Sequence, residues 1–283
     1  MTKDYACFFC FANAFGRLIE KHGLTNQQKT EFTQFIAQLG ANDTLYSSPE
    51  FSVQLHRKLK EYSGNEDVYA NEKNESNKKA KEMAAKWLPE KTSDYPFDLT
   101  LRLAIAGNIM DYGAPTNRDI EKNIEYVLKT DFAIDHSKSL QNEIKNAKQI
   151  LYLGDNAGEI VFDKLFIEHI KHRNIYFAYR GFPIINDVTI KDVTELEMGK
   201  VAKTISNGYD APSTILEKCS PEFQEVWENS DLIISKGQGN LEGLIDEKSK
   251  KIYFLLMVKC DVIAEHLQVK KGDFVVKCNL IDV

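Results

Sequence analysis

Apolar residues in the first half of the chain recur every three to four positions, a spacing typical of amphipathic helices. The pattern predicts helices over 5–20, 27–39, 51–62, 78–87, 97–110, 117–127 and 137–145. Thr25 is expected to cap the second helix, and Ser48 followed by Pro49 suits the start of the third. The polar stretch 63–79 is expected to be an exposed loop that runs into the fourth helix. The first half therefore predicts a helical N-terminal domain over residues 1–146.

The pattern of hydrophobic and polar positions changes near residue 147, where short apolar runs begin to alternate with helical patterns. The runs predict strands over 149–153, 175–179, 201–205, 232–235, 251–258 and 274–276, with helical patterns over 159–172, 213–219 and 222–229. Apolar runs without strict alternation indicate parallel strands that are buried on both faces. The predicted fold class is α/β: the helical N-terminal domain packs on a Rossmann-like α/β domain, residues 147–283, with a mainly parallel sheet.

Composition narrows the function classes. The 283 residues include 36 Lys and Arg against 42 Asp and Glu, giving a net charge of −6, which argues against a general nucleic-acid binder. No run approaches the roughly 18 apolar residues of a membrane span, and the first residues lack the apolar core of a secretory signal. Five scattered cysteines form no disulfide framework. We therefore expect a cytoplasmic protein with neither nucleic-acid nor membrane partners.

Candidate chemistry gathers directly after four predicted strands. Ligands of an open parallel sheet bind beyond the carboxyl ends of its strands, so these positions are the ones to inspect. They carry residues 154–159 (Gly-Asp-Asn-Ala-Gly-Glu), Arg180 with residues 186–187 (Asn-Asp), residues 236–242 (Lys-Gly-Gln-Gly-Asn-Leu-Glu) and residues 259–261 (Lys-Cys-Asp). One such loop could be a simple turn. The same bias at four ends of one sheet favours a functional site.

Three of these residues offer oxygen atoms to a cation. Asp155 and Asn156 lie at a strand-to-helix junction, and Asp187 follows the next strand. Carboxylate and amide oxygens suit Mg²⁺ or Mn²⁺ better than a structural zinc ion, which prefers cysteine and histidine. The alternative is that Asp155 or Asn156 only caps the following helix. A cation site and a helix cap both remain open at this point.

Lysine and glycine at the end of a later strand suggest the complementary half of a phosphate site. In residues 236–240, Gly237 and Gly239 would let backbone N–H groups approach an anion, and Lys236 would add positive charge. The order of residues fits neither a Walker A loop nor a G-x-G-x-x-G turn. Taken alone, the Gly-Gln-Gly segment favours a tight turn. A divalent cation beside an anion-binding lysine makes metal-assisted phosphoester hydrolysis the leading chemistry.

The remaining motif is Cys7-x-x-Cys10 near the start of the chain. A single such pair lacks the four thiolates of an all-cysteine zinc site, and no strand precedes it as in a thioredoxin-like motif. Buried structural cysteines are the favoured interpretation, with metal or redox use as the alternative. No Gly-x-Ser-x-Gly elbow is present, so a serine hydrolase is unsupported.

These motifs together resemble the metal-dependent damage-control phosphatases, a family first described as domain of unknown function 89. The resemblance rests on Cys7-x-x-Cys10 and on residues 106–113 (Ala-Gly-Asn-Ile-Met-Asp-Tyr-Gly), 154–159, 183–187 (Pro-Ile-Ile-Asn-Asp), 236–242 and 259–260. The pieces span nearly the whole chain in the family's order. The cysteine pair and the Gly-Gln-Gly-Asn form are similar to the compact, stand-alone prokaryotic branch.

The resemblance implies a helical N-terminal part on a Rossmann-like domain and a divalent metal, with Mn²⁺, Mg²⁺, Co²⁺ and Ni²⁺ as candidates. It also implies an enzyme that hydrolyses small phosphomonoesters, such as sugar phosphates or damaged phosphorylated metabolites. The metal ligands carry over to Asp155, Asn156 and Asp187, and Asp155 and Lys236 are the expected catalytic residues. The expected substrate-binding residues are Asn108, Asp111, Arg180, Lys236, Gly237, Gly239, Asn240 and Lys259.

Two rival functions remain. The turn at residues 154–158 could belong to an S-adenosylmethionine-dependent carboxyl methyltransferase, although such an enzyme has no evident use for a metal triad or an anion-binding lysine. A non-catalytic protein that binds a phosphorylated metabolite would keep the pocket and release no phosphate. The sequence leaves the oligomeric state, the substrate and the nucleophile (water or an aspartate) open.

Overall fold

The protein is described by a computed structural model covering residues 4–41, 47–87, 95–107 and 120–281. Its helices are α1 (Tyr5–Lys21), α2 (Asn26–Ala41), α3 (Ser48–Ser63), α4 (Ala70–Trp87), α5 (Phe97–Ala106), α6 (Ile120–Lys129), α7 (Ser137–Asn146), α8 (Glu159–Ile170), α9 (Ile190–Glu195), α10 (Pro221–Asn229), α11 (Gly237–Leu244) and α12 (Asp261–Leu267), with short 3₁₀ turns η3 (Met198–Lys200) and η4 (Leu216–Lys218). Its strands are β1 (Ile134–Asp135), β2 (Ile150–Leu153), β3 (Ile175–Tyr179), β4 (Lys203–Ser206), β5 (Leu232–Lys236), β6 (Ile252–Met257) and β7 (Phe274–Cys278).

The seven strands form one sheet in the order β1-β7-β6-β5-β2-β3-β4. All neighbouring pairs are parallel except β6 and β7. The prediction of a mainly parallel sheet is thus confirmed. The chain proceeds outward from β2 through β3 to β4, and then returns to β5 on the other side of β2. This reversal leaves a crevice beyond the carboxyl ends of β2 and β5, which is where open α/β sheets bind ligands.

Helices cover both faces of the sheet, which explains the nearly continuous apolar runs of its central strands. Ile150 and Tyr152 of β2 point into a core shared with α4 to α9, whereas Leu151 and Leu153 point into a core shared with α10 to α12. Side chains of a strand alternate between its two faces, so both faces need apolar residues here. The same alternation determines on which face of the sheet Lys236, the last residue of β5, lies.

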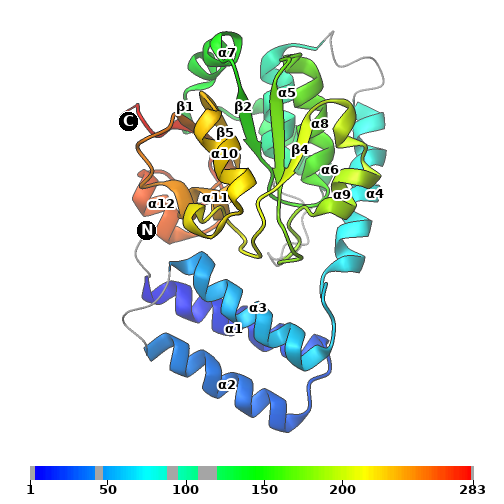
Figure 1. Ribbon diagram of the computed structural model, residues 1–283, viewed down its shortest axis with the longest axis vertical. Coiled ribbons are helices and arrows are strands. Elements are labelled where there is room, and N and C mark those ends of the chain that lie inside the picture. The colour runs from blue at the N-terminus through cyan, green and yellow to red at the C-terminus, as the bar shows by residue number, and fades with distance from the viewer. Residues whose placement is uncertain (1–3, 42–46, 88–94, 108–119, 282–283) are drawn as a thin grey trace.

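Helices α1 to α3 form an N-terminal bundle with a core of its own, centred on Phe15, Phe32 and Phe51. Figure 1 shows the bundle as a separate layer below the sheet. Helices α4 to α7 also precede residue 146, but they pack on the sheet, and β1 pairs with β7. The hydrophobic cores therefore separate α1 to α3, rather than all of residues 1–146, from the sheet and its covering helices.

Several local expectations differ from the structure. Helix α4 begins at Ala70, so the expected loop over 63–79 is largely helical, and the expected helix over 213–219 is reduced to the turn η4. The Gly-Gln-Gly segment, expected as a loop, is the first turn of α11. Buried contacts override local polarity in α4, where Lys73, Ser76 and Asn77 are almost inaccessible to solvent.

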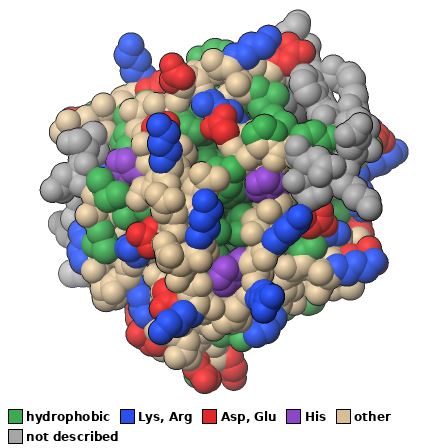
Figure 2. All heavy atoms as spheres, turned by 90° about the horizontal axis from the view of Figure 1, so that it is seen from above, with side chains coloured by type: hydrophobic (Ala, Val, Ile, Leu, Met, Phe, Trp, Pro, Cys, Tyr) green, Lys and Arg blue, Asp and Glu red, His purple; other side chains and the backbone are tan. Residues whose placement is uncertain are grey.

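None of the helices in the described residues has the length and apolar character needed to cross a membrane. Figure 2 shows the face opposite the N-terminal bundle, where Lys and Arg side chains are interspersed with Asp and Glu. Among the described residues on that face, no continuous basic surface is visible that could follow a nucleic-acid backbone.

Candidate active site

A cavity of about 180 Å³ lies between the N-terminal bundle and the carboxyl ends of the strands. The α/β layers contribute Asp155, Asn156, Ile185, Asn186, Asp187, Pro212, Gln238, Gly239, Glu242 and Lys259, and the bundle contributes Phe11, Ser48, Pro49 and Ser52. The cavity therefore occupies the crevice that the strand order predicts. Residues from both ends of the chain close it.

Backbone pairing brings the loops after β2 and β3 together. Asn156 and Asp187 form an isolated antiparallel bridge. The Val188 amide donates to the Asp155 carbonyl at 2.8 Å, and the Ala157 amide donates to the Asn186 carbonyl at 2.8 Å. These bonds fix the two loops against each other, so the acidic and amide side chains they carry share one wall of the cavity.

The side chains of the expected metal ligands converge on Arg180 and on one another. Arg180 donates through Nε to Asp187 Oδ2 at 2.6 Å, and its Nη2 lies 3.8 Å from Asp155 Oδ1. Asn156 donates through Nδ2 to Asp155 Oδ2 at 2.7 Å. All four side chains are buried. The structure thus assembles Asp155, Asn156 and Asp187, which the sequence placed in two separate loops.

The electrostatics of the cluster favour a bound cation. Burial raises the pKa of Asp155 well above its ordinary value, and the negative charges of Asp187 and Glu159 raise it further. Lys259 and Arg180 oppose this effect. A divalent cation would stabilise both ionised aspartates, since an opposite charge favours the charged form of a carboxyl group. Two carboxylates and a carboxamide are suitable oxygen ligands for Mg²⁺ or Mn²⁺.

The protein itself offers few ligand atoms to a metal ion. Among the described residues, no group of three His, Cys, Asp or Glu side chains could hold a metal ion. In the cluster described above, Asp155 and Asp187 are the two acids, and the third member is the amide of Asn156. Hard cations such as Mg²⁺ usually keep several water ligands and use one or two carboxylates, so the set fits a catalytic ion.

Residue 237 must be glycine because Asp155 lies too close for a side chain at this position. A Cβ atom at this position would lie 1.9 Å from Asp155 Oδ2, and its backbone φ of 77° is in the left-handed region that favours glycine. Gly239 is restricted as well, because a Cβ atom there would lie 2.1 Å from the Pro212 carbonyl oxygen. The two glycines of the Gly-Gln-Gly segment therefore make room for Asp155 and for the loop at Pro212.

Lys236 does not lie where the sequence-based prediction put it. Its ammonium donates to Glu159, to Asp163 Oδ1 at 2.6 Å and to the Ala104 carbonyl at 2.9 Å. Lys236, Glu159 and Asp163 are all 0% exposed, and Lys236 is absent from the described residues that line the cavity. The expected phosphate contact is instead the centre of a buried ion-pair network beneath the cavity.

Lys259 supplies the positive charge of the cavity wall. It lines the cavity, and its charge acts against the raised pKa of Asp155. Its backbone amide donates to Gln238 Oε1 at 2.8 Å, which fixes the end of β6 against α11. Of the two lysines expected to contact phosphate, Lys259 is therefore the one placed to do so.

Two other expected substrate-binding residues are engaged in holding the site together. Arg180 also donates through Nη2 to Asn240 Oδ1 at 3.1 Å. The Asn240 amide donates to the carbonyl groups of Lys236 at 2.8 Å and Gly154 at 3.2 Å. These bonds tie the start of α11 to the end of β2. Arg180 and Asn240 thus support the cluster from behind rather than facing the cavity.

Asn108 and Asp111 lie outside the described residues, so their expected contacts stay predictions. Within the described part, the sequence analysis missed Asn186 as a site residue. Asn186 lines the cavity with 1% of its surface exposed, and neither its Nδ2 nor its Oδ1 atom has a hydrogen-bond partner among the described residues. The preceding residue, Ile185, has a φ of 42°, an uncommon value for a β-branched side chain. Such strain is concentrated at functional sites.

The N-terminal bundle contributes Ser48, Pro49 and Ser52 from the first turns of α3. Sequence reasoning could not place them at the site, because their approach depends on packing between distant segments. Arg57 of α3 forms two hydrogen bonds with Asp210, at 2.8 and 2.6 Å, and Lys60 donates to the Pro183 carbonyl. The Lys60 contact fixes α3 beside the loop that carries Asp187, and the Arg57 contacts fix it beside the loop after β4.

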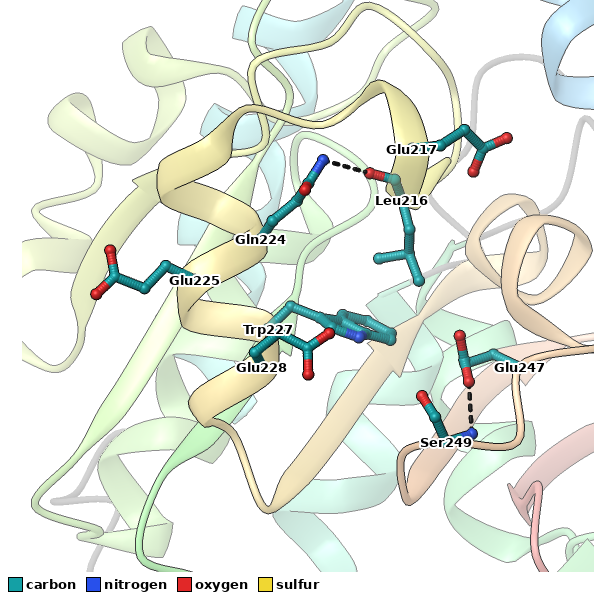
Figure 3. A pocket seen from close by; sticks show the side chains of 8 residues that line it. All are labelled: Leu216, Glu217, Gln224, Glu225, Trp227, Glu228, Glu247 and Ser249. Carbon is teal, nitrogen blue, oxygen red and sulfur yellow. Dashed lines mark hydrogen bonds between the residues drawn. The ribbon is translucent and has the colours of Figure 1, made fainter.

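A larger hollow of about 370 Å³ lies elsewhere, around Trp227. It is lined by Leu216, Glu217, Gln224, Glu225, Trp227, Glu228, Glu247 and Ser249. Figure 3 shows that Glu217 and Glu225 extend in opposite directions, away from the indole ring. Its residues form no convergent catalytic group, so the smaller cavity at the strand ends is the candidate active site.

The fold and site define a Rossmann-like α/β protein with an acid–amide cluster at the switch point of its sheet. The chain belongs to the damage-control phosphatase ARMT1-like family, whose domain model matches residues 4–275. It is 34% identical over 281 residues to damage-control phosphatase PH1575 of Pyrococcus horikoshii, covering 97% of each chain. A damage-control phosphatase of Archaeoglobus fulgidus is 35% identical over 235 residues, which is 80% of this chain and 81% of that protein.

A solved structure supports the same conclusion for the fold. The crystal structure of the Pyrococcus horikoshii protein, described as a DUF89 family protein, aligns with a TM-score of 0.88 at 33% identity. The alignment covers 99% of both chains. The family resemblance noted in the sequence is therefore confirmed over the whole chain, including the N-terminal bundle.

Proposed function

We propose that this protein is a metal-dependent phosphatase that hydrolyses small phosphomonoesters to an alcohol and inorganic phosphate. The observation that carries the proposal is the buried convergence of Asp155, Asn156 and Asp187 on a cavity that also holds Lys259. Acids and an amide on one wall suit a cation, and the lysine suits a phosphate. The relatives named as damage-control phosphatases support the same class of reaction.

Asp155, Asn156 and Asp187 would hold the cation, with Mn²⁺, Mg²⁺, Co²⁺ or Ni²⁺ as candidates. When bound, the cation would neutralise charge on the phosphoryl oxygens. Arg180 would hold Asp187 in place through the 2.6 Å hydrogen bond between Nε and Oδ2. Because Arg180 is buried behind the cluster, its role is to support the ligands and not to bind substrate.

Lys259 and the first turn of α11 would bind the transferring phosphoryl group. Gln238 and Gly239 of that turn line the cavity, and the N-terminus of a helix attracts anions through its free N–H groups. Preorganised charges aimed at the developing negative charge stabilise the transition state of phosphoryl transfer. Lys236 is assigned to the support of the site and not to contact with phosphate.

The leaving group would occupy the part of the cavity beside the N-terminal bundle. Asn186, whose amide has no partner in the described part of the chain, and the serines Ser48 and Ser52 offer hydrogen bonds to a hydroxylated molecule such as a sugar. Phe11, Pro49 and Ile185 add apolar surface to the same wall. This mixture favours a small polar metabolite over a long apolar chain.

A phosphate-release screen tests the proposal. Purified protein is treated with a chelator, then assayed with sugar phosphates, nucleotides and pantetheine phosphates, with and without each candidate cation. We expect phosphate release that needs the cation and that falls at least about 100-fold in Asp155→Asn and Asp187→Asn, because each change removes a charged ligand. Circular dichroism confirms that the variants are folded.

Release that survives the chelator, or that survives both substitutions, contradicts the proposed site. Tight cation-independent binding of S-adenosylmethionine without phosphate release would favour the methyltransferase alternative instead. Binding of a phosphorylated metabolite without turnover under any cation would favour a non-catalytic binding protein.

A further inference from the structure

The buried network beneath the cavity points to a role for two residues that contact no substrate. We infer that Glu159 and Lys236 are positioning residues that orient the Asn156 side chain so that its oxygen faces the cation. The inference rests on the proposed function, because it concerns the same cation site. It gives a reason for an acid and a lysine that are both 0% exposed.

The hydrogen bonds of Asn156 determine which way its amide is turned. Its Nδ2 atom donates to Asp155 Oδ2 at 2.7 Å and to Glu159 Oε2 at 3.1 Å. An amide nitrogen carries two hydrogens, so these acceptors use its whole donor capacity. The reversed amide would place its oxygen against two carboxylates. In the observed orientation, Nδ2 is the end of the amide that contacts the two acids, which leaves Oδ1 as the end that can bind the cation.

Both oxygen atoms of the Glu159 carboxylate accept hydrogen bonds, so the orientation of this carboxylate is fixed. Lys236 donates to Glu159 Oε1, while Oε2 receives the Asn156 side chain and, at 3.4 Å, the Asn156 backbone amide. A lysine ammonium is a donor and never an acceptor. The order of donation, from Lys236 and from Asn156 onto Glu159, leaves a single consistent arrangement of the three side chains.

The carboxamide analogue breaks this arrangement without changing the shape of residue 159. In Glu159→Gln, one end of the new side chain is an amide nitrogen, which must face either the Lys236 ammonium or the Asn156 amide. Both neighbours are donors, so one donor–donor contact results in either orientation. Rotation of Asn156 would relieve this contact and would turn its oxygen away from the cation.

Asp163 provides a matched control in the same network. It accepts from Lys236 at 2.6 Å and from the Tyr152 hydroxyl at 2.6 Å, and it is buried to the same extent as Glu159. No hydrogen bond between Asp163 and Asn156 is present in the described structure. Asp163→Asn therefore disturbs the same buried lysine while leaving the contacts of Asn156 in place.

The test measures Mn²⁺ affinity by titration with electron paramagnetic resonance detection of free Mn²⁺, using the full-length protein. We expect Glu159→Gln to weaken the dissociation constant by about 10- to 100-fold, the usual effect of losing an outer partner of a metal ligand. Asp163→Asn should change it less than about threefold. Glu159→Asp, which keeps the charge but shortens the reach to Asn156, should resemble Glu159→Gln and serves if that variant fails to fold.

A double-mutant cycle separates positioning from general destabilisation. In the background Asn156→Ala, the further change Glu159→Gln should leave the Mn²⁺ dissociation constant within about threefold, because the oriented group is gone. An equal loss in both backgrounds, or an equal loss in Asp163→Asn, overturns the inference. Failure of the wild-type protein to bind Mn²⁺ would instead contradict the proposed function.

Discussion

Arg180 and Asp187 form a buried ion pair in which the guanidinium Nε lies 2.6 Å from Oδ2. The same guanidinium faces Asp155, so one arginine lies beside both of the acidic side chains that we propose as cation ligands. Its removal would take away the ion-pair partner of Asp187 and one of the two positive charges, with Lys259, that act on Asp155. The pair therefore predicts that the stability of the chain depends on the occupancy of the proposed cation site.

Arg180→Met should lower the free energy of unfolding by roughly 3–5 kcal/mol in the absence of divalent cations, the usual cost of leaving a buried charge unpaired. Saturating Mn²⁺ should restore more stability in the variant than it adds to the wild-type protein. Thermal denaturation with and without Mn²⁺ measures both effects. Equal stabilisation of the two proteins by Mn²⁺ would show that Arg180 does not influence the cation site.

Gly237→Ala should abolish cation binding, because the added Cβ would lie 1.9 Å from Asp155 Oδ2 and the residue has a positive φ. Displacement of Asp155 is the simplest relief of that contact. Gly199→Ala is the matched control, since its Cβ would meet no atom within 4 Å. Calorimetric titration with Mn²⁺ should find binding in the control and none in Gly237→Ala. Ordinary affinity in both variants would contradict the close packing described.

The two lysines should respond differently to neutralisation. Lys259→Met should reduce kcat/KM for phosphomonoester hydrolysis by about 100-fold, equivalent to about 2.7 kcal/mol, with little change in the melting temperature. Lys236→Met should instead lower the melting temperature strongly, because it leaves Glu159 and Asp163 without a counter-charge. Kinetics and thermal melts of both variants provide the comparison. A phosphate-binding role for Lys236 would predict the opposite pattern.

The N-terminal bundle should loosen in acid because of His56. Burial, chiefly, lowers the pKa of His56 from 6.5 to about 4 in the folded protein. The unfolded chain thus binds a proton more readily, so the stabilising contribution is complete above pH 6.5 and is lost as pH falls towards 4. The loss amounts to about 3 kcal/mol. It should appear in urea denaturation between pH 7 and pH 4.

His56→Gln is the control for this prediction. Glutamine has no titratable group, so the variant should lack this component of the pH dependence, although it is less stable at pH 7. The His56 ring packs against Phe15 with ring centroids 4.7 Å apart, and the variant loses that contact. Identical slopes of stability against pH in the two proteins would assign the acid sensitivity to other groups.

Much of the architecture follows from local pattern. The apolar runs of β2, β5 and β6 could be predicted because helices bury both faces of the sheet. Asp155 and Asp187 could be predicted as site residues because they lie in the loops that follow β2 and β3. The N-terminal wall of the cavity is different. Ser48 and Ser52 reach the site through packing between segments far apart in the chain, which no local pattern encodes.

The buried position of Lys236 could in principle have been predicted from the sequence. It shares its parity along β5 with Leu232 and Ile234, which face the core containing α8. Side chains two residues apart in a strand lie on the same face. Glu159 and Asp163 are four residues apart and therefore share one face of α8. Strand alternation and helical spacing together indicate an ion-pair network, whereas the Lys-Gly motif alone suggested a phosphate loop.

The separate hydrophobic core of α1 to α3 has a consequence for how such proteins diversify. In the proposed phosphatase, replacement of residues on the inner surface of that bundle would reshape the space for the leaving group while Asp155, Asn156 and Asp187 keep their mutual geometry. Selectivity and reactivity would then evolve on different segments of one polypeptide, and a single scaffold could acquire new metabolites through changes near its beginning.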